Sequence, residues 1–238
     1  MEALHIITPV KDSIELTLQT IEAVMNSTVS VPFEYTIYND FSTPENTTIL
    51  KDAAAKYGFT LVNLEDITTN PSPNYLLVLR TAQKKAISAG AGLLIIESDV
   101  VVKSDTVQRL FEEAKNRPDC GIAASATVDE TGAINYPYLF AKGKENSAYP
   151  TRKHLSFCCS LLTLNYLRKF DFATLNPEKN WHDVTISRQS LKEGFTNYLF
   201  TNLPVWHRPH SSRPWKLLKY TNPVKYYWLK ITKRRDKI

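Results

Sequence analysis

The chain has 238 residues, 43% hydrophobic and 22% charged, which is typical of a globular protein with one large domain or a domain plus an extension. Its net charge of +5 is unevenly spread. Residues 208–238 hold ten of the 29 basic residues and one of the 24 acidic ones, so the remainder is slightly acidic. We therefore predict no nucleic-acid partner, because the main domain lacks the basic surface that such a partner requires.

The cysteines and the N-terminus indicate a cytoplasmic protein. Cys120, Cys158 and Cys159 show neither a disulfide framework nor the spacing of a zinc site, and no His or basic cluster in the sequence would activate their thiols. We expect these thiols to pack in the core. No apolar run of about 18 residues predicts a transmembrane helix, and the first residues lack the basic start of a signal peptide.

Strands and helices alternate through the first half of the chain. We expect strands at residues 3–9, 33–38, 59–64 and 120–128, and a further strand in the stretch 93–102, which carries the acidic triplet. We expect helices at residues 14–25, 43–57, 75–89 and 104–116, the first of them capped by Asp12 or Ser13 and the second ended by Gly58. This alternation predicts an α/β fold in which right-handed crossovers build a mainly parallel sheet with helices on both faces.

The second half is less regular. Residues 65–73 and 129–153 are predicted to be loops, and the second is a long surface loop of the kind that often serves function. Residues 155–164 are apolar and fit either a strand or a helix. A helix at 181–194 and a last strand at 195–200 complete the predicted elements.

The acidic triplet Glu97-Ser98-Asp99 follows the most apolar strand of the chain. Ligands bind at the carboxyl ends of strands in open α/β sheets. On an extended strand, Glu97 and Asp99 would point the same way, about 6–7 Å apart. Such a pair suits a divalent cation, Mg²⁺ or Mn²⁺, that bridges phosphate oxygens. The alternative is a simple acidic turn after a core strand.

Five segments in order resemble the inverting nucleotide-sugar glycosyltransferases of family 2, which have the GT-A fold. They are Ile-Ile-Thr-Pro-Val-Lys-Asp at 6–12, Asn-Asp-Phe-Ser-Thr at 39–43, Glu-Ser-Asp at 97–99, Phe-Asp-Phe at 170–172 with Trp-His-Asp at 181–183, and Val-Trp-His at 205–207 with Ser211 or Ser212. The resemblance implies a GT-A domain over 1–207, with a nucleotide-sugar half at about 1–103 and an acceptor half at about 104–207. Residues 208–238 form an extension.

The sequence departs from the family pattern at four places. Asn39 and Phe41 replace the first Asp and the Gly of the nucleoside turn, Glu97 stands where Asp is usual, and His182 replaces the Glu beside the expected base. The resemblance leaves the sugar donor open.

The resemblance implies a role for each residue. Thr8, Pro9, Asp12, Asp40, Ser42 and Ser98 would bind the nucleotide, Glu97, Asp99 and His207 the metal, and Trp181, His182 and Arg188 the sugar or acceptor. Asp183 would be the general base that inversion requires.

Each role has a plainer alternative. Asp40 and Asp183 could instead cap helices, and Trp181 could pack in the core. A single His such as His207 is more often structural than a ligand. Arg188 could pair with Glu193 rather than with a phosphate.

The resemblance implies glycosyl transfer from a nucleotide-sugar donor to a glycan or lipid-linked acceptor, as in polysaccharide biosynthesis. A non-catalytic nucleotide- or glycan-binding module remains an alternative, and a nucleotidyltransferase a weaker one, because the turn after the first strand lacks a Gly-rich loop. The basic, aromatic tail has three interpretations: a helix docked on the domain, a homodimer contact, or peripheral contact with the inner face of an anionic membrane.

Overall fold

The structure is a computed structural model, and it describes residues 1–179, 181–208, 218 and 222–232. Its elements run in the order β1 (Leu4–Val10), α1 (Ile14–Met25), β2 (Phe33–Asn39), α2 (Pro44–Tyr57), β3 (Thr60–Asn63), η1 (Leu64–Asp66), α3 (Tyr75–Ser88), β4 (Gly92–Ile96), β5 (Val100–Val101), α4 (Thr106–Lys115), β6 (Cys120–Val128), η2 (Leu139–Ala141), β7 (Ala148–Pro150), β8 (Cys159–Leu162), α5 (Leu164–Lys169), η3 (Phe172–Thr174), α6 (His182–Lys192), β9 (Thr196–His207) and α8 (Pro223–Thr232). Ser211, Ser212 and most of the tail lie outside the described residues.

The described strands form one nine-stranded sheet, ordered β3-β2-β1-β4-β8-β6-β9-β5, with β7 paired to β9. The pairs β2–β3, β1–β2, β1–β4 and β6–β9 are parallel, as the alternation of strands and helices predicts. Four pairs are antiparallel: β4–β8, β6–β8, β5–β9 and β7–β9. The sheet is therefore mixed, with strands β1 to β4 of the first half paired in parallel and one further parallel pair, β6–β9, among the antiparallel strands.

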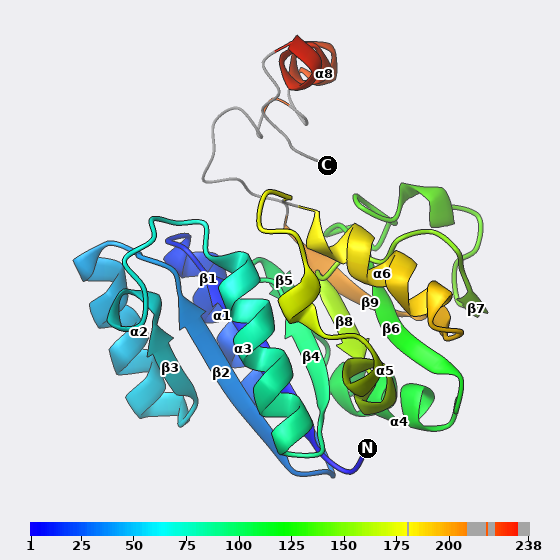
Figure 1. Ribbon diagram of the computed structural model, residues 1–238, viewed down its shortest axis with the longest axis horizontal. Coiled ribbons are helices and arrows are strands. Elements are labelled where there is room, and N and C mark those ends of the chain that lie inside the picture. Colours follow the sequence, from blue (N-terminus) through cyan, green and yellow to red (C-terminus); the bar gives the residue numbers. More distant parts are fainter. Residues whose placement is uncertain (180, 209–217, 219–221, 233–238) are drawn as a thin grey trace.

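Helices cover both faces of the sheet (Figure 1). Buried residues of α1, α2 and α4 join one apolar cluster, which includes Ile21, Leu50 and Leu110. Buried residues of α3, α5 and α6 join a second cluster on the opposite face, which includes Leu79 and Ile186. The two clusters sandwich the sheet, and its central strand β4 is buried throughout because it is covered on both sides.

Helix boundaries follow local chemistry. The Thr43 side chain accepts a hydrogen bond from the Asn46 backbone N–H and caps α2, and Pro44 occupies the first helical position. Gly58 ends that helix with φ 78°, a left-handed conformation that favours glycine. Ser13 lies at the predicted start of α1, but its side chain makes no capping hydrogen bond.

Two predictions for the second half require correction, and the structure decides the alternative left open for residues 155–164. The 129–153 segment contains η2 and β7, and its Tyr138 and Ala141 are fully buried, so it is only partly a surface loop. Residues 155–164 hold β8 and the start of α5, and β9 continues to His207 instead of ending at residue 200. The missed feature was the antiparallel pairing, which depends on contacts distant in the sequence. None of the described helices has both the length and the apolarity needed to cross a membrane.

Candidate functional site

A cavity of about 340 Å³ opens where β1 and β2 end, which is within the size range of ligand pockets. Its walls include Pro9 near the end of β1, Lys11 and Asp12 after β1, Asp40 after β2, and Ser72, Pro73 and Tyr75 at the start of α3. Three residues that the sequence analysis assigned to the nucleotide, Pro9, Asp12 and Asp40, therefore line one pocket.

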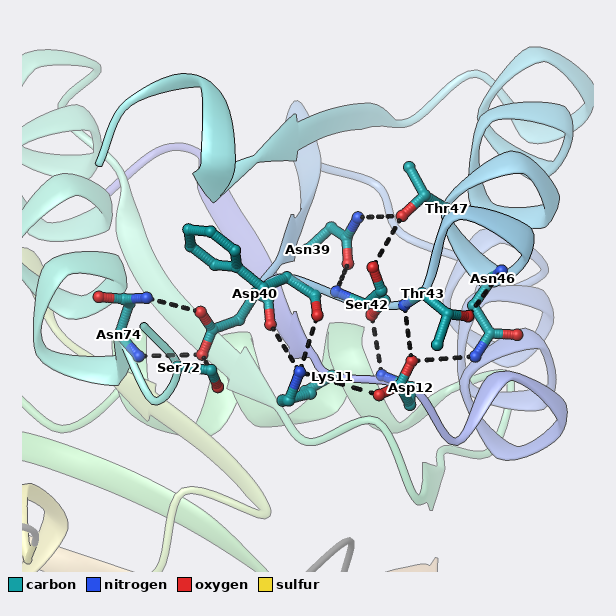
Figure 2. Close-up of polar contacts among 11 residues, drawn as sticks. Lys11, Asp12, Asn39, Asp40, Ser42, Thr43, Asn46, Thr47, Ser72 and Asn74 are labelled. Atoms are coloured by element: carbon teal, nitrogen blue, oxygen red, sulfur yellow. Dashed lines mark hydrogen bonds and ion pairs between the residues drawn. The ribbon is translucent and has the colours of Figure 1, made fainter. Parts of the chain in front are cut away.

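The Asp40 carboxylate binds the segment before α3, which forms one wall of this pocket (Figure 2). This carboxylate accepts hydrogen bonds from the Ser72 hydroxyl at 2.7 Å, the Asn74 backbone N–H at 2.9 Å and the Asn74 side-chain amide at 2.8 Å. The alternative that Asp40 caps the next helix is wrong, because Thr43 occupies that position. The carboxylate anchors the 65–74 segment beside the cavity.

The opposite wall is built by contacts between the β1–α1 and β2–α2 turns (Figure 2). The Asp12 carboxylate accepts from the Thr43 N–H at 2.9 Å and from the Asn46 amide at 3.0 Å, while the Asp12 N–H donates to the Ser42 hydroxyl at 2.8 Å. Burial opposes ionisation of Asp12, but these donors outweigh it and hold its pKa below the ordinary value. Lys11 donates to the Phe41 carbonyl at 2.7 Å. Asp12 and Ser42 therefore shape the pocket by linking the β1–α1 turn to the β2–α2 turn.

Asn39 has a structural reason to differ from the family's Asp. It is buried, and its side-chain amide donates to the Thr47 hydroxyl and to the Asn63 side-chain oxygen, each at 3.0 Å. Its side-chain oxygen accepts from the Ser42 N–H at 3.3 Å. A carboxylate could only accept, so it could not satisfy the Asn63 oxygen.

Thr8 lies below the pocket and does not line it. Its side chain is fully buried and its hydroxyl is bonded to the Tyr35 hydroxyl at 2.9 Å. Its backbone alone is placed to shape the turn at Pro9.

The acidic triplet forms a turn, so the extended geometry predicted for it is wrong. Strand β4 ends at Ile96, and the Val100 N–H donates to the Glu97 carbonyl at 3.2 Å, which closes a turn that includes half-buried Ser98. Strand β5 then places Val100 opposite His207 of β9. This pairing brings the His207 Nε2 to 3.5 Å from the Asp99 Oδ2, so the structure places together all three predicted metal-binding residues, Glu97, Asp99 and His207.

Cys158 also lies in this group, although the sequence did not mark it as a candidate ligand. Its Sγ lies 3.1 Å from the Glu97 Oε2 and 4.0 Å from the His207 Nε2. One ligand atom from each of Glu97, Cys158 and His207 lies within 4.8 Å of the others. The thiol is buried, as predicted, but the expectation that no histidine accompanies it is wrong.

The electrostatics of the cluster suit a cation. Burial and the neighbouring Asp99 carboxylate raise the pKa of Glu97 to about 7. Burial disfavours protonation of His207, but Asp99 and Glu97 outweigh it, so the His207 pKa lies above its ordinary value. Burial and Glu97 also raise the pKa of the Cys158 thiol well above its ordinary value. These buried acids and the imidazole form the oxygen and nitrogen donor set that divalent metals use.

The orientation of His207 fits a metal ligand. Its Nδ1 lies 2.9 Å from the Tyr136 carbonyl oxygen, which requires a proton on that nitrogen. The Nε2 therefore faces the carboxylates and, in the neutral ring, presents its lone pair to them. A ligating histidine held through its other nitrogen by a carbonyl is the usual arrangement of metal sites.

Tyr75 connects the pocket with the acidic cluster. It lines the cavity, and burial together with Glu97 and Asp183 raises its pKa well above the ordinary value. Its buried hydroxyl has no hydrogen-bond partner among the described residues. Only its place after a proline-containing loop could have marked it in the sequence.

The predicted acceptor residues lie at the start of α6. Asp183 is in the first turn and not at the N-cap, which is Trp181, and its Oδ1 accepts a hydrogen bond from the Val184 N–H of that turn at 2.8 Å. Asp183 also raises the pKa of Glu97, which places it within electrostatic reach of the acidic cluster. His182 is buried beside Tyr75, with ring centroids 6.4 Å apart, and burial lowers its pKa.

Two other acceptor-side residues are accessible. Trp181 is half-exposed and does not belong to either core cluster, and the Lys230 ammonium lies 4.4 Å from its ring centroid. Arg188 is exposed further along α6. Glu193, its suggested partner, accepts a hydrogen bond from Gln189 at 2.8 Å.

No protein-family model matches the chain. No curated protein matches it either. Solved structures do resemble it. The mannosyltransferase PcManGT from Pyrobaculum calidifontis, in complex with GDP-Man and Mn²⁺, has a TM-score of 0.64 and 13% identity over 98% of this chain and 65% of that chain.

Two further structures are similar. TarS residues 1–349 from S. aureus, in complex with UDP-GlcNAc, has a TM-score of 0.64 and 14% identity over 89% of this chain and 60% of that chain. GalNAc-T7 with UDP, GalNAc and Mn²⁺ has a TM-score of 0.66 and 10% identity over 89% of this chain and 45% of that chain. The chain thus spans 45% to 65% of the length of these three structures. Its mixed sheet with helices on both faces is the GT-A fold of glycosyltransferases.

Proposed function

We propose that this protein transfers a sugar from a nucleoside-diphosphate sugar to an acceptor hydroxyl, with a divalent metal and with inversion at the anomeric carbon. The observation that carries the proposal is the position of Tyr75 relative to two features, the pocket and the carboxylate cluster. Tyr75 lines the cavity of about 340 Å³, and burial together with the charges of Glu97 and Asp183 raises its pKa. The fold neighbours bound to GDP-Man, UDP-GlcNAc and Mn²⁺ support the same assignment.

In the proposed mechanism, the pocket residues Pro9, Asp12 and Asp40 position the nucleoside, with Thr8 and Ser42 shaping its walls. Asp99, His207 and Glu97 would hold the Mg²⁺ or Mn²⁺, and Ser98 lies in the same turn. A metal held by these residues would supply positive charge to neutralise the negative charge that develops on the leaving diphosphate.

Asp183 takes the proton of the acceptor hydroxyl as that oxygen attacks the sugar from the face opposite the leaving group. Its place in the first turn of α6, within electrostatic reach of Glu97, supports this role. Trp181 offers its ring to a sugar face, and His182 and Arg188 contact the acceptor or the phosphates.

The acceptor is proposed to be a glycan or a lipid-linked sugar at a membrane surface. Helix α8 exposes four large apolar side chains at helical spacing: Val224, Tyr227, Trp228 and Ile231. The surrounding tail, residues 208–238, is strongly basic. An apolar stripe with aromatic residues in a basic segment suits peripheral contact with the inner face of an anionic membrane. A homodimer contact is the competing use of the same surface.

A non-catalytic nucleotide- or glycan-binding module is the second candidate. The observation that favours it is that Asn39, Glu97 and His182 depart from the residues of the glycosyltransferase pattern at the nucleoside turn, the metal motif and the position beside the expected base. Such a module would bind nucleotide sugars without cleaving them.

Cleavage of the donor distinguishes the two candidates. Purified protein is incubated with UDP- and GDP-sugars and Mn²⁺, and release of the nucleoside diphosphate is followed with and without a membrane-lipid or glycan extract as acceptor. We expect release to be stimulated by acceptor, to fall by at least about 10²-fold in Asp183→Asn, and to be unchanged in the control Asp52→Asn on the exposed face of α2. Donor binding without any cleavage would establish the binding module instead.

A further inference from the structure

Cys158 is held in the acidic cluster by strand pairing. The register of β4 with β8 places Ile96 opposite Cys159, and one step further the Glu97 N–H donates to the Cys158 carbonyl at 3.0 Å. Residues directly opposite each other on antiparallel strands have neighbouring side chains. The backbone itself therefore fixes the thiol beside the Glu97 carboxylate.

The surroundings of the thiol are polar. Its Sγ lies 3.1 Å from the Glu97 Oε2, 3.2 Å from the Ser156 hydroxyl and 4.0 Å from the His207 Nε2. Cys158 and His207 are both buried, and a ligand atom of each lies within 4.8 Å of one on Glu97. This is the separation expected of atoms that share one ion, since metal–ligand distances are about 2.0–2.3 Å.

The neighbouring cysteine provides an internal comparison. Cys159 is equally buried and belongs to the same apolar cluster, but it lies within β8, where successive side chains point to opposite faces. It is not among the residues that could hold an ion, in the part of the chain that the structure describes. The two thiols thus share their burial but differ in access to the cluster.

We propose that the Sγ of Cys158 is a ligand of the divalent cation, together with His207 and the Glu97–Asp99 carboxylates, and that the site therefore prefers thiophilic cations such as Zn²⁺ and Co²⁺ to Mg²⁺. The proposal rests on the metal centre of the proposed function and adds Cys158 as its fourth ligand residue. Thiolates select borderline and soft cations, whereas Mg²⁺ favours oxygen ligands and retained waters. On binding, the S–metal bond forms as the S–H bond breaks, and the thiol proton passes to solvent.

The test uses the whole protein without nucleotide. Cd²⁺ and, separately, Co²⁺ are titrated into wild-type protein, Cys158→Ala, Cys158→Ser and the matched control Cys159→Ala. The readout is the near-ultraviolet charge-transfer absorption that only a thiolate–metal bond produces, together with proton release in weak buffer. Far-ultraviolet circular dichroism checks that each variant is folded.

We expect one equivalent of charge-transfer absorption in wild type and Cys159→Ala, and none in either Cys158 variant. The affinity for Cd²⁺ should fall by at least about tenfold in both Cys158 variants, and the preference for Co²⁺ over Mg²⁺ should fall with it. Cation binding without the absorption band in wild type would overturn the cysteine ligand while leaving the metal centre intact. Absence of any cation binding, with or without a nucleoside diphosphate, would overturn both.

Discussion

Asp40 controls the shape of the pocket at the ends of β1 and β2 through three hydrogen bonds to the segment before α3. Replacing it with Ala leaves the buried Asn74 backbone N–H without its acceptor, and leaves the Asn74 amide with the Asn70 carbonyl alone. Unsatisfied donors of this kind cost about 1–3 kcal/mol, and nucleotide binding should weaken with the released loop.

Urea unfolding and nucleotide titration measure both effects. Ser72→Ala is the matched control, since it removes one of the three bonds and leaves the Asn74 donors satisfied, so its cost should stay near 1 kcal/mol. Equal costs for the two variants would contradict the anchoring role of Asp40.

The raised pKa of Glu97 predicts a pH-dependent stability of the metal-free protein. Its pKa rises from the ordinary 4.5 to about 7 through burial and Asp99. Between these values the unfolded chain loses the proton while the folded chain keeps it, so the free energy of unfolding falls as the pH rises. His207, whose pKa is also raised, contributes with the same sign as the pH passes its folded-state value.

The measurement is chemical denaturation in chelator at about pH 5 and about pH 8, for wild type and Glu97→Gln. The free energy of unfolding should decline more steeply in wild type than in Glu97→Gln over this interval. Added Mn²⁺ should restore stability at the higher pH, where the ligands lose their protons more easily. Parallel profiles for the two proteins would show that Glu97 is not perturbed.

At the scale of elements, Gly121 marks the close contact between β6 and the end of α6. A Cβ on Gly121 would overlap the Ser190 hydroxyl and lie 2.7 Å from the Phe195 Cβ, which cannot swing away. Overpacking of this kind costs about 1–3 kcal/mol, so Gly121→Ala should lower the midpoint of thermal unfolding.

Gly92 in β4 is the comparison. A Cβ there would meet mainly the far end of the Met1 side chain, which can move, and the Leu161 Cδ1 at 3.0 Å. Gly92→Ala should therefore destabilise less than Gly121→Ala. The reverse order in thermal denaturation would contradict the packing between β6 and α6.

The way in which the strands pair explains which parts of the fold and of the site could be predicted from the sequence. The parallel half of the sheet, with the turns that bring Pro9, Asp12 and Asp40 to one pocket, follows from local alternation and from the order of the motifs. Cys158 could not be predicted because its neighbour Glu97 comes from antiparallel pairing across 61 residues. The 97–99 turn was missed because an apolar run on both sides of the triplet resembles one continuous strand.

At the scale of the whole molecule, helix α8 carries the proposed membrane contact. In co-sedimentation with vesicles, wild-type protein should bind anionic vesicles more strongly than neutral ones, and salt should weaken binding because the tail charge is screened. The double variant Trp228→Ala, Ile231→Ala should lose most of this binding, since both side chains are exposed on the stripe.

Ile67→Ala is the control, because Ile67 is an exposed apolar residue outside the tail. If the double variant instead converts a dimer to a monomer in light scattering, with vesicle binding unchanged, the stripe is a contact between two copies of the chain.

The central claim is a metal-dependent nucleotide-sugar site at the ends of β1, β2 and β4. The most direct test is calorimetric titration with UDP-, dTDP- and GDP-sugars, with Mn²⁺, with Mg²⁺ and in chelator, on wild type, Asp99→Ala and the exposed control Asp52→Ala. We predict that one class of donor binds wild type and the control only when metal is present, and that Asp99→Ala loses this binding. Absence of binding by every donor with either metal, or unchanged binding in Asp99→Ala, would contradict the site.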